Sequence, residues 1–160
     1  YQCLGLRKVL FNGTTDDWFV IDFQSDNSNP LKYAGHLYIG DSEVTEISTP
    51  DTITVIPPYV CVGMVSLNSL TLGEAVVKIS SHAFDGCRSL QTIDAKPVVA
   101  PQLERYAFLN TTIRSIQVKD EESKDSYRST WGKRYNYDVM TLPVIDDNNA
   151  EIVEILPENQ

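Results

Sequence analysis

Residues 79–95 read Ile79-Ser-Ser-His-Ala-Phe84-Asp-Gly-Cys87-Arg-Ser-Leu90-Gln-Thr-Ile93-Asp-Ala95, and this stretch decides the fold. Its apolar frame reappears 23 residues earlier, where the equivalents of Ile79, Ala83, Phe84, Gly86, Cys87, Leu90 and Ile93 are Ile56, Val60, Cys61, Gly63, Met64, Leu67 and Leu70. It reappears 24 residues later at Leu103, Ala107 and Phe108. A period of this length is the sequence signature of a solenoid.

A half-repeat with the pattern L-x-x-[LIV]-x-φ, in which φ is apolar, recurs along the chain in five copies that begin at Leu6, Val44, Leu67, Leu90 and Ile113. Its alternation of apolar and polar residues is that of a short strand. One copy has too little apolar surface to fold alone, whereas stacked copies pair into a parallel sheet and bury a continuous apolar ladder. The pattern therefore predicts a strand-rich α/β solenoid, with turns around Gly63 and Gly86 on the other side.

The three cysteines fit this register as core residues. Cys3 and Cys87 occupy equivalent positions three coils apart, or about 15 Å at roughly 4.8 Å per strand. A disulfide needs Cα atoms within about 7 Å, so this separation excludes a disulfide between Cys3 and Cys87. Cys61 takes the place of Phe84 and is expected to face the core. The odd count and the lack of a CxxC spacing also disfavour a zinc site, so we predict three buried free thiols.

The frame Ile79-x-x-x-Ala83-Phe84-x-Gly86-Cys87-x-Ser89-Leu90-x-x-Ile93 resembles the leucine-rich repeat of BspA-like bacterial surface proteins. The resemblance implies a right-handed leucine-rich-repeat solenoid over residues 1–142, with short turns or helices opposite the parallel sheet. It departs from the family pattern at residues 59–62, where Val60-Cys61 replaces the usual Ala-Phe.

Two segments of residues 1–142 lie outside the repeat. Residues 12–38 resemble an insertion of that family, and we expect Trp18 and Tyr33 to pack it onto the solenoid flank; a ligand platform is the alternative. Residues 120–140 resemble a C-terminal helical cap, in which Ser123 is expected to start a helix that places Tyr127 and Trp131 on one face. Residues 143–160 are expected to form an acidic tail or linker, in which the apolar segment 152–156 is a candidate strand.

Composition and motifs exclude several classes of function. The net charge of −9 disfavours nucleic acid as a partner, and no stretch approaches the roughly 20 apolar residues of a membrane helix. Only His36 and His82 offer imidazole chemistry, and no catalytic or phosphate-binding motif occurs. The acidic run at 146–149 does not have the spacing of a calcium loop. We expect neither catalysis nor a cofactor nor a metal.

The outward positions of the stacked strands are the candidate ligand-binding site, because solenoids commonly use this face for recognition. Its residues are Arg7, Lys8, Glu46, Asn68, Ser69, Gln91, Thr92, Asp94, Arg114 and Gln117. None is aromatic, although aromatic residues usually anchor interfaces. A plain solvated surface is therefore the competing interpretation.

By resemblance, the function is expected to be non-catalytic recognition or adhesion at the cell surface or in secreted form. The implied partners are protein or glycan ligands, host matrix proteins among them, with no membrane insertion by this fragment. A structural spacer and a targeting module of a larger surface enzyme are the alternatives. Because the chain begins with Tyr1 in mid-repeat, we expect it to be part of a longer protein.

Overall fold

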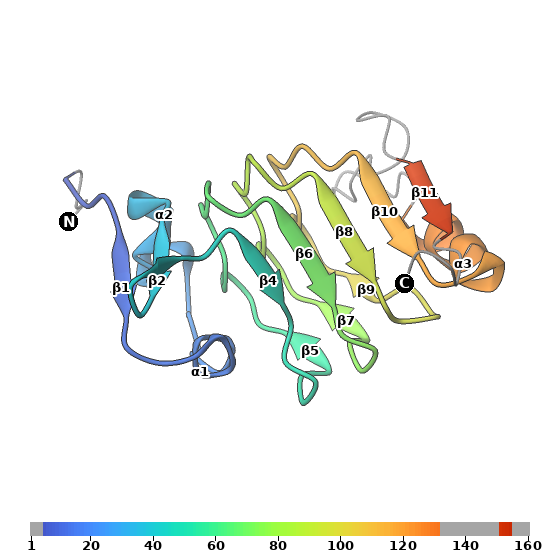
Figure 1. Ribbon diagram of the computed structural model, residues 1–160, viewed down its shortest axis with the longest axis horizontal. Helices are drawn as coiled ribbons and strands as arrows, with labels where there is room; N and C mark the ends of the chain where they lie inside the picture. Colours follow the sequence, from blue (N-terminus) through green and yellow to red (C-terminus); the bar gives the residue numbers. More distant parts are fainter. Residues whose placement is uncertain (1–4, 132–150, 155–160) are drawn as a thin grey trace.

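A computed structural model describes residues 5–131 and the backbone of residues 151–154 (Figure 1). The N-terminal elements are β1 (Val9–Phe11), α1 (Thr15–Phe19), the 3-10 helix η1 (Asp26–Ser28), α2 (Leu31–Ala34), β2 (Leu37–Ile39) and β3 (Ser42–Glu43). The repeats supply β4 (Glu46–Ser48), β5 (Val55–Ile56), β6 (Ser69–Leu72), β7 (Lys78–Ile79), β8 (Thr92–Ala95), β9 (Gln102–Leu103) and β10 (Ser115–Val118). Helix α3 (Glu121–Trp131) and β11 (Glu151–Glu154) follow.

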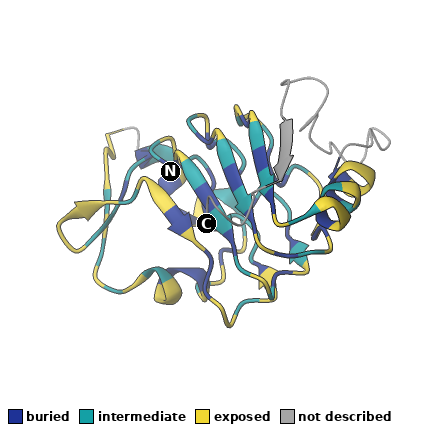
Figure 2. Cartoon of the chain, turned by 45° about the vertical axis from the view of Figure 1, so that its right-hand side comes forward, coloured by how far each residue is buried: buried dark blue, intermediate teal, exposed yellow. Residues whose placement is uncertain are grey.

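The predicted solenoid is confirmed for four of the five half-repeats. Strands β4, β6, β8 and β10 run parallel in one five-stranded sheet of order β11-β10-β8-β6-β4. Their inward residues stand in one register, in which Ile47 pairs with Leu70, Leu70 with Ile93 and Ile93 with Ile116. A second parallel sheet, β5-β7-β9, forms the other side of each coil and pairs Ile56 with Ile79 and Ile79 with Leu103. Buried and more exposed residues alternate along the strands, as Figure 2 shows.

The half-repeat at Leu6 does not form a further strand of that sheet, and this expectation was wrong. Strand β1 belongs to a separate sheet, β1-β2-β3, in which Val9 pairs with Leu37. Leu6 itself is 36% exposed. The reason is the insertion, which brings residues 37–39 beside β1 before the chain reaches β4 (Figure 1).

The insertion packs onto the solenoid through Trp18, as expected, whereas Tyr33 contacts Asn27 and Lys32 of the insertion itself. The side chain of Thr14 accepts a hydrogen bond from the Asp17 amide while the Asp17 carboxylate accepts one from the Thr14 amide, which forms a complete capping box at α1. This helix buries Trp18, whose indole Nε1 donates to the Val60 carbonyl at 2.8 Å. Asn29, fully buried, donates from Nδ2 to the Tyr59 carbonyl at 2.9 Å. The insertion therefore closes the N-terminal end of the core.

Helix α3 closes the other end. Tyr127 and Trp131 are fully buried, and the Trp131 indole donates to the Pro101 carbonyl at 2.8 Å. The helix starts earlier than expected: Asp120, not Ser123, caps it, because the Asp120 carboxylate accepts from the Ser123 amide at 2.8 Å. Residues 132–140 of the predicted cap lie outside the described residues. Of the predicted tail, Glu151–Glu154 forms β11, which pairs Ile152 with Ile116.

The interior contains two of the three cysteines. Cys61 and Cys87 are fully buried free thiols, as predicted, and Cys3 lies outside the described residues. Burial in an apolar core raises the pKa of both thiols well above the ordinary value of a cysteine, so they remain protonated at neutral pH. Next to them, the rings of Phe84 and Phe108 stack at 5.2 Å between centroids. The buried positions of the repeat therefore form one continuous core.

Candidate functional site

Eight of the ten predicted site residues lie together on the outer side of the five-stranded sheet. They are Glu46, Asn68, Ser69, Gln91, Thr92, Asp94, Arg114 and Gln117, and all are exposed or half-buried. These residues form three columns across the strands: Asn68, Gln91 and Arg114 in the first, Glu46, Ser69 and Thr92 in the second, and Asp94 and Gln117 in the third. Strand pairing aligns Glu46 with Ser69, Ser69 with Thr92, and Asp94 with Gln117. We call this set the strand face.

The first column of the strand face precedes the strands and is also held in register. The amide of Asn68 donates to the Thr45 carbonyl at 2.7 Å, that of Gln91 to the Asn68 carbonyl at 3.0 Å, and that of Arg114 to the Gln91 carbonyl at 2.8 Å. The hydrogen-bond ladder therefore begins before each strand. It fixes the backbone from which these exposed side chains project.

Arg7 and Lys8 do not belong to the strand face. They precede β1, which is in the other sheet, so the prediction that they continue these columns was wrong. The Lys8 amino group lies over the Tyr38 ring, 5.4 Å from its centroid. Lys8 thus contacts the neighbouring strand β2 of its own sheet.

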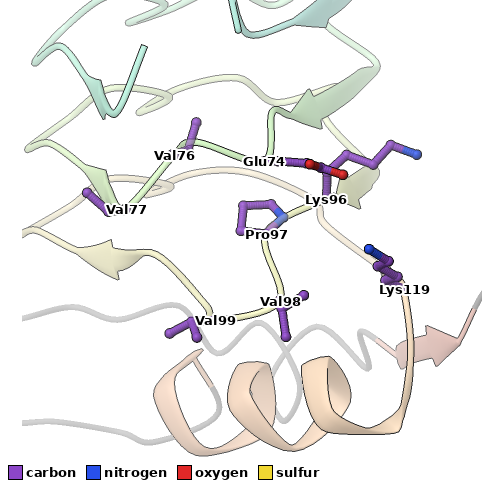
Figure 3. A pocket seen from close by; sticks show the side chains of 8 residues that line it. All are labelled: Glu74, Val76, Val77, Lys96, Pro97, Val98, Val99 and Lys119. Atoms are coloured by element: carbon purple, nitrogen blue, oxygen red, sulfur yellow. The ribbon is translucent and has the colours of Figure 1, made fainter. Parts of the chain in front are cut away.

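A hollow of about 320 Å³ lies where the strands of this sheet end (Figure 3). Lys96 directly follows β8 and Lys119 directly follows β10. The eight lining residues are Glu74, Val76, Val77, Lys96, Pro97, Val98, Val99 and Lys119. The hollow was not predicted from the sequence, although a Val-Val pair that recurs in successive coils at 76–77 and 98–99 is a pattern that could have indicated it.

The hollow offers aliphatic surface to a ligand. Val77 and Val99 are 62% and 72% exposed and offer apolar surface to a ligand. The lining residues include two amines and one carboxylate but no Ser, Thr, Cys or His. Lys96 forms an ion pair at 3.0 Å with Asp94, which belongs to the strand face. The hollow and the strand face are therefore adjoining parts of one surface.

Neither histidine lies in the hollow. His82 Nδ1 is 2.8 Å from the carboxylate of Asp85, and His36 Nδ1 is 2.5 Å from that of Glu43. Within the part of the chain that the structure describes, no three His, Cys, Asp or Glu side chains cluster in a way that could hold a metal ion. No described helix is long and apolar enough to span a bilayer.

Comparison with known proteins agrees with this architecture. A family model described as "BspA type Leucine rich repeat region (6 copies)" matches residues 36–130. The match begins at the end of the insertion, covers every strand from β2 to β10, and ends inside α3. No curated protein and no solved structure matches the chain.

Proposed function

Since this chain belongs to the BspA-type leucine-rich repeat family, we propose that it is a non-catalytic recognition module for a protein or glycan ligand at a cell surface. Repeat solenoids present extended surfaces on which a partner can dock, and their packed interiors leave no cleft for a reaction. Adhesion to host matrix proteins is the most specific form of this proposal. It rests on the family alone.

The observation that carries the proposal is the continuity of the strand face with the hollow. Amide, hydroxyl and charged groups of four strands stand in register, which suits hydrogen bonding to a flat partner. The hollow at the ends of β8 and β10 adds the aliphatic surface that those polar columns lack. A ligand with polar groups and one aliphatic side chain fits both parts.

The test is a binding screen of the purified chain against immobilised extracellular matrix proteins and a glycan array. Thr92 lies between Ser69 and Ser115 in the middle of the sheet, so Thr92→Arg places a long charged side chain at the centre of the surface. We expect about a tenfold loss of affinity for any ligand that the screen identifies. The matched control is Thr130→Arg, which adds the same charge on an exposed position of α3.

The outcomes separate the proposal from its alternatives. Equal binding by Thr92→Arg and by the unmodified chain would exclude the strand face as the site. No binding to any matrix protein or glycan would contradict adhesion and favour the structural spacer. Loss of binding in Thr130→Arg as well would show that added charge, rather than the position of the change, weakens the complex.

A further inference from the structure

Three residues at equivalent positions of successive coils share an uncommon backbone conformation. Tyr59, His82 and Tyr106 have φ angles of 59°, 55° and 61°, in the left-handed region. They lie in the turns that follow β5, β7 and β9 and lead back to the five-stranded sheet. We call these three residues the turn ladder. L-residues with a bulky side chain seldom adopt this conformation, and such strain tends to concentrate at functional sites.

The same turns contain a second residue in the left-handed region. Four residues further on, Gly63 and Gly86 also have positive φ angles, of 74° and 81°. Glycine adopts this conformation without steric cost. The turn ladder, in contrast, has a large ring in all three coils, although glycine would adopt its conformation without strain.

The rings of the turn ladder form a stack along the solenoid. The Tyr59 and His82 rings lie 5.2 Å apart and nearly parallel, and the His82 and Tyr106 rings lie 5.0 Å apart. The guanidinium group of Arg105 is 4.8 Å from the centroid of the Tyr106 ring. Adjacent rings thus cover the faces that they turn toward one another, and all three residues are half-buried. Ring edges and polar ends are what the stack offers to a partner.

The charges around the turn ladder largely compensate one another. The Asp85 carboxylate contacts His82 Nδ1 at 2.8 Å and accepts a hydrogen bond from Asn110 Nδ2 at 3.3 Å. On the insertion nearby, Asp26 pairs with Lys32. These pairs place charges of both signs side by side, which does not favour a strongly charged partner such as nucleic acid.

We propose that the turn ladder is a second docking surface and that its partner is an extended segment of another protein. Tyrosine and arginine are the residues most enriched at the energetic centres of protein interfaces, and the strand face has no aromatic residue. Sugars stack on open ring faces, and the faces between these rings cover one another, whereas peptide groups can hydrogen-bond to tyrosine hydroxyls. A straight row of three rings suits a chain laid along the solenoid. This inference goes beyond the proposed function, because it does not involve the strand face.

The experiment uses a phage-displayed library of random peptides selected on the purified whole chain. Selected peptides are then titrated against the double variant Tyr59→Gly/Tyr106→Gly. Glycine accepts the left-handed conformation, so the variant keeps the turn geometry while it loses the ring contacts. For the glycine variant we expect at least a tenfold loss of peptide affinity. The second variant, Tyr59→Phe/Tyr106→Phe, retains the stack and loses only the hydroxyl contacts. Circular dichroism and the unfolding midpoint establish that each variant is folded.

The matched comparison is Thr92→Arg on the strand face, which should bind the selected peptides as the unmodified chain does. Peptides that lose affinity for Thr92→Arg but not for the glycine variant would overturn the proposal and leave the strand face as the binding site. Failure to select any peptide, or glycan binding that the glycine variant abolishes, would overturn it as well. Loss of peptide binding in the glycine variant alone supports the turn ladder independently of the strand face.

Discussion

Leu90 illustrates how a single position of the repeat acts in the fold. Its side chain is fully buried, as are its equivalents Leu67 and Ile113 one coil away on either side. Its carbonyl accepts a hydrogen bond from the Thr112 amide at 3.2 Å, so backbone and side chain both join adjacent coils. A residue of this kind contributes to stability through packing that no single coil can supply.

Leu90→Ala should therefore destabilise the chain by about 2–5 kcal/mol, the range for truncating a buried leucine. Urea unfolding followed by circular dichroism measures the difference. The neighbouring Gln91 is exposed, and Gln91→Ala should change stability by no more than about 0.5 kcal/mol. A loss below about 1 kcal/mol for Leu90→Ala would contradict the buried ladder.

The tight turn at Gly63 also depends on a contact with a distant part of the chain. Gly63 has a positive φ angle, and a Cβ atom there would lie 2.8 Å from the Cα of Lys32 on the insertion. Asn110 takes the equivalent position in the last turn with a φ of 56°, which asparagine tolerates better than most residues. The sequence predicted the tight bend at Gly63 and Gly86. The close approach of the insertion is a tertiary feature that no local pattern reveals.

At the scale of elements, the short sheet β5-β7-β9 depends on side chains as well as on its few backbone hydrogen bonds. Glu104, which follows β9, pairs at 2.5 Å with Lys78 of β7, and its other carboxylate oxygen accepts from the Ser81 amide at 3.0 Å. The hydrogen bond from Lys78 chiefly, and that from Ser81, hold the pKa of Glu104 below its ordinary value. These contacts join successive coils on the side away from the strand face.

A lowered pKa in the folded state gives stability that is present above the ordinary value of about 4.5 and is lost as the pH falls through the lower, folded value. Glu104→Gln removes this contribution. We expect the variant to be less stable at neutral pH and to lose less stability between about pH 5 and pH 3 than the unmodified chain. Thermal unfolding across that range measures both effects.

The control for this prediction is Glu122→Gln, which removes one carboxylate from an exposed position of α3. The difference in stability between neutral and acid pH should be closer to that of the unmodified chain for Glu122→Gln than for Glu104→Gln. Parallel acid curves for Glu104→Gln and the unmodified chain would mean that the contacts of Glu104 with Lys78 and Ser81 do not contribute to folding.

At the scale of the whole molecule, the solenoid core is closed at both ends by the same device. Trp18 at one end and Trp131 at the other are buried, and each indole donates at 2.8 Å to a backbone carbonyl of the adjacent coil. Because each repeat contacts mainly its neighbours, terminal coils expose apolar surface that must be covered. The two tryptophans provide that cover with segments from outside the repeat.

Trp131→Ala should destabilise the chain by about 3–5 kcal/mol, as for other buried tryptophans, and the loss should be greatest at the C-terminal end. Hydrogen exchange should accelerate first in β10 and α3, and last in β4 and β6. The exposed neighbour Thr130 gives the control Thr130→Ala. Uniform acceleration across all coils would show instead that the array unfolds as one unit.

The repeat register, the buried ladder and the outward columns of the strand face could be predicted from the sequence, because the strand alternation and the 23-residue period are local properties of the chain. The sequence also predicted that the aromatic residues of the insertion and of α3 pack onto the solenoid.

The strand with which β1 pairs, the lining of the hollow and the stacking of the Tyr59, His82 and Tyr106 rings all depend on how distant segments meet in the folded chain. The pairing of β1 depends on where the insertion ends in space, and this removed Arg7 and Lys8 from the strand face. The hollow and the stack each bring together side chains from segments that are 20 or more residues apart in sequence. Contacts between coils have no signature in the residues of any one coil, because they arise from stacking.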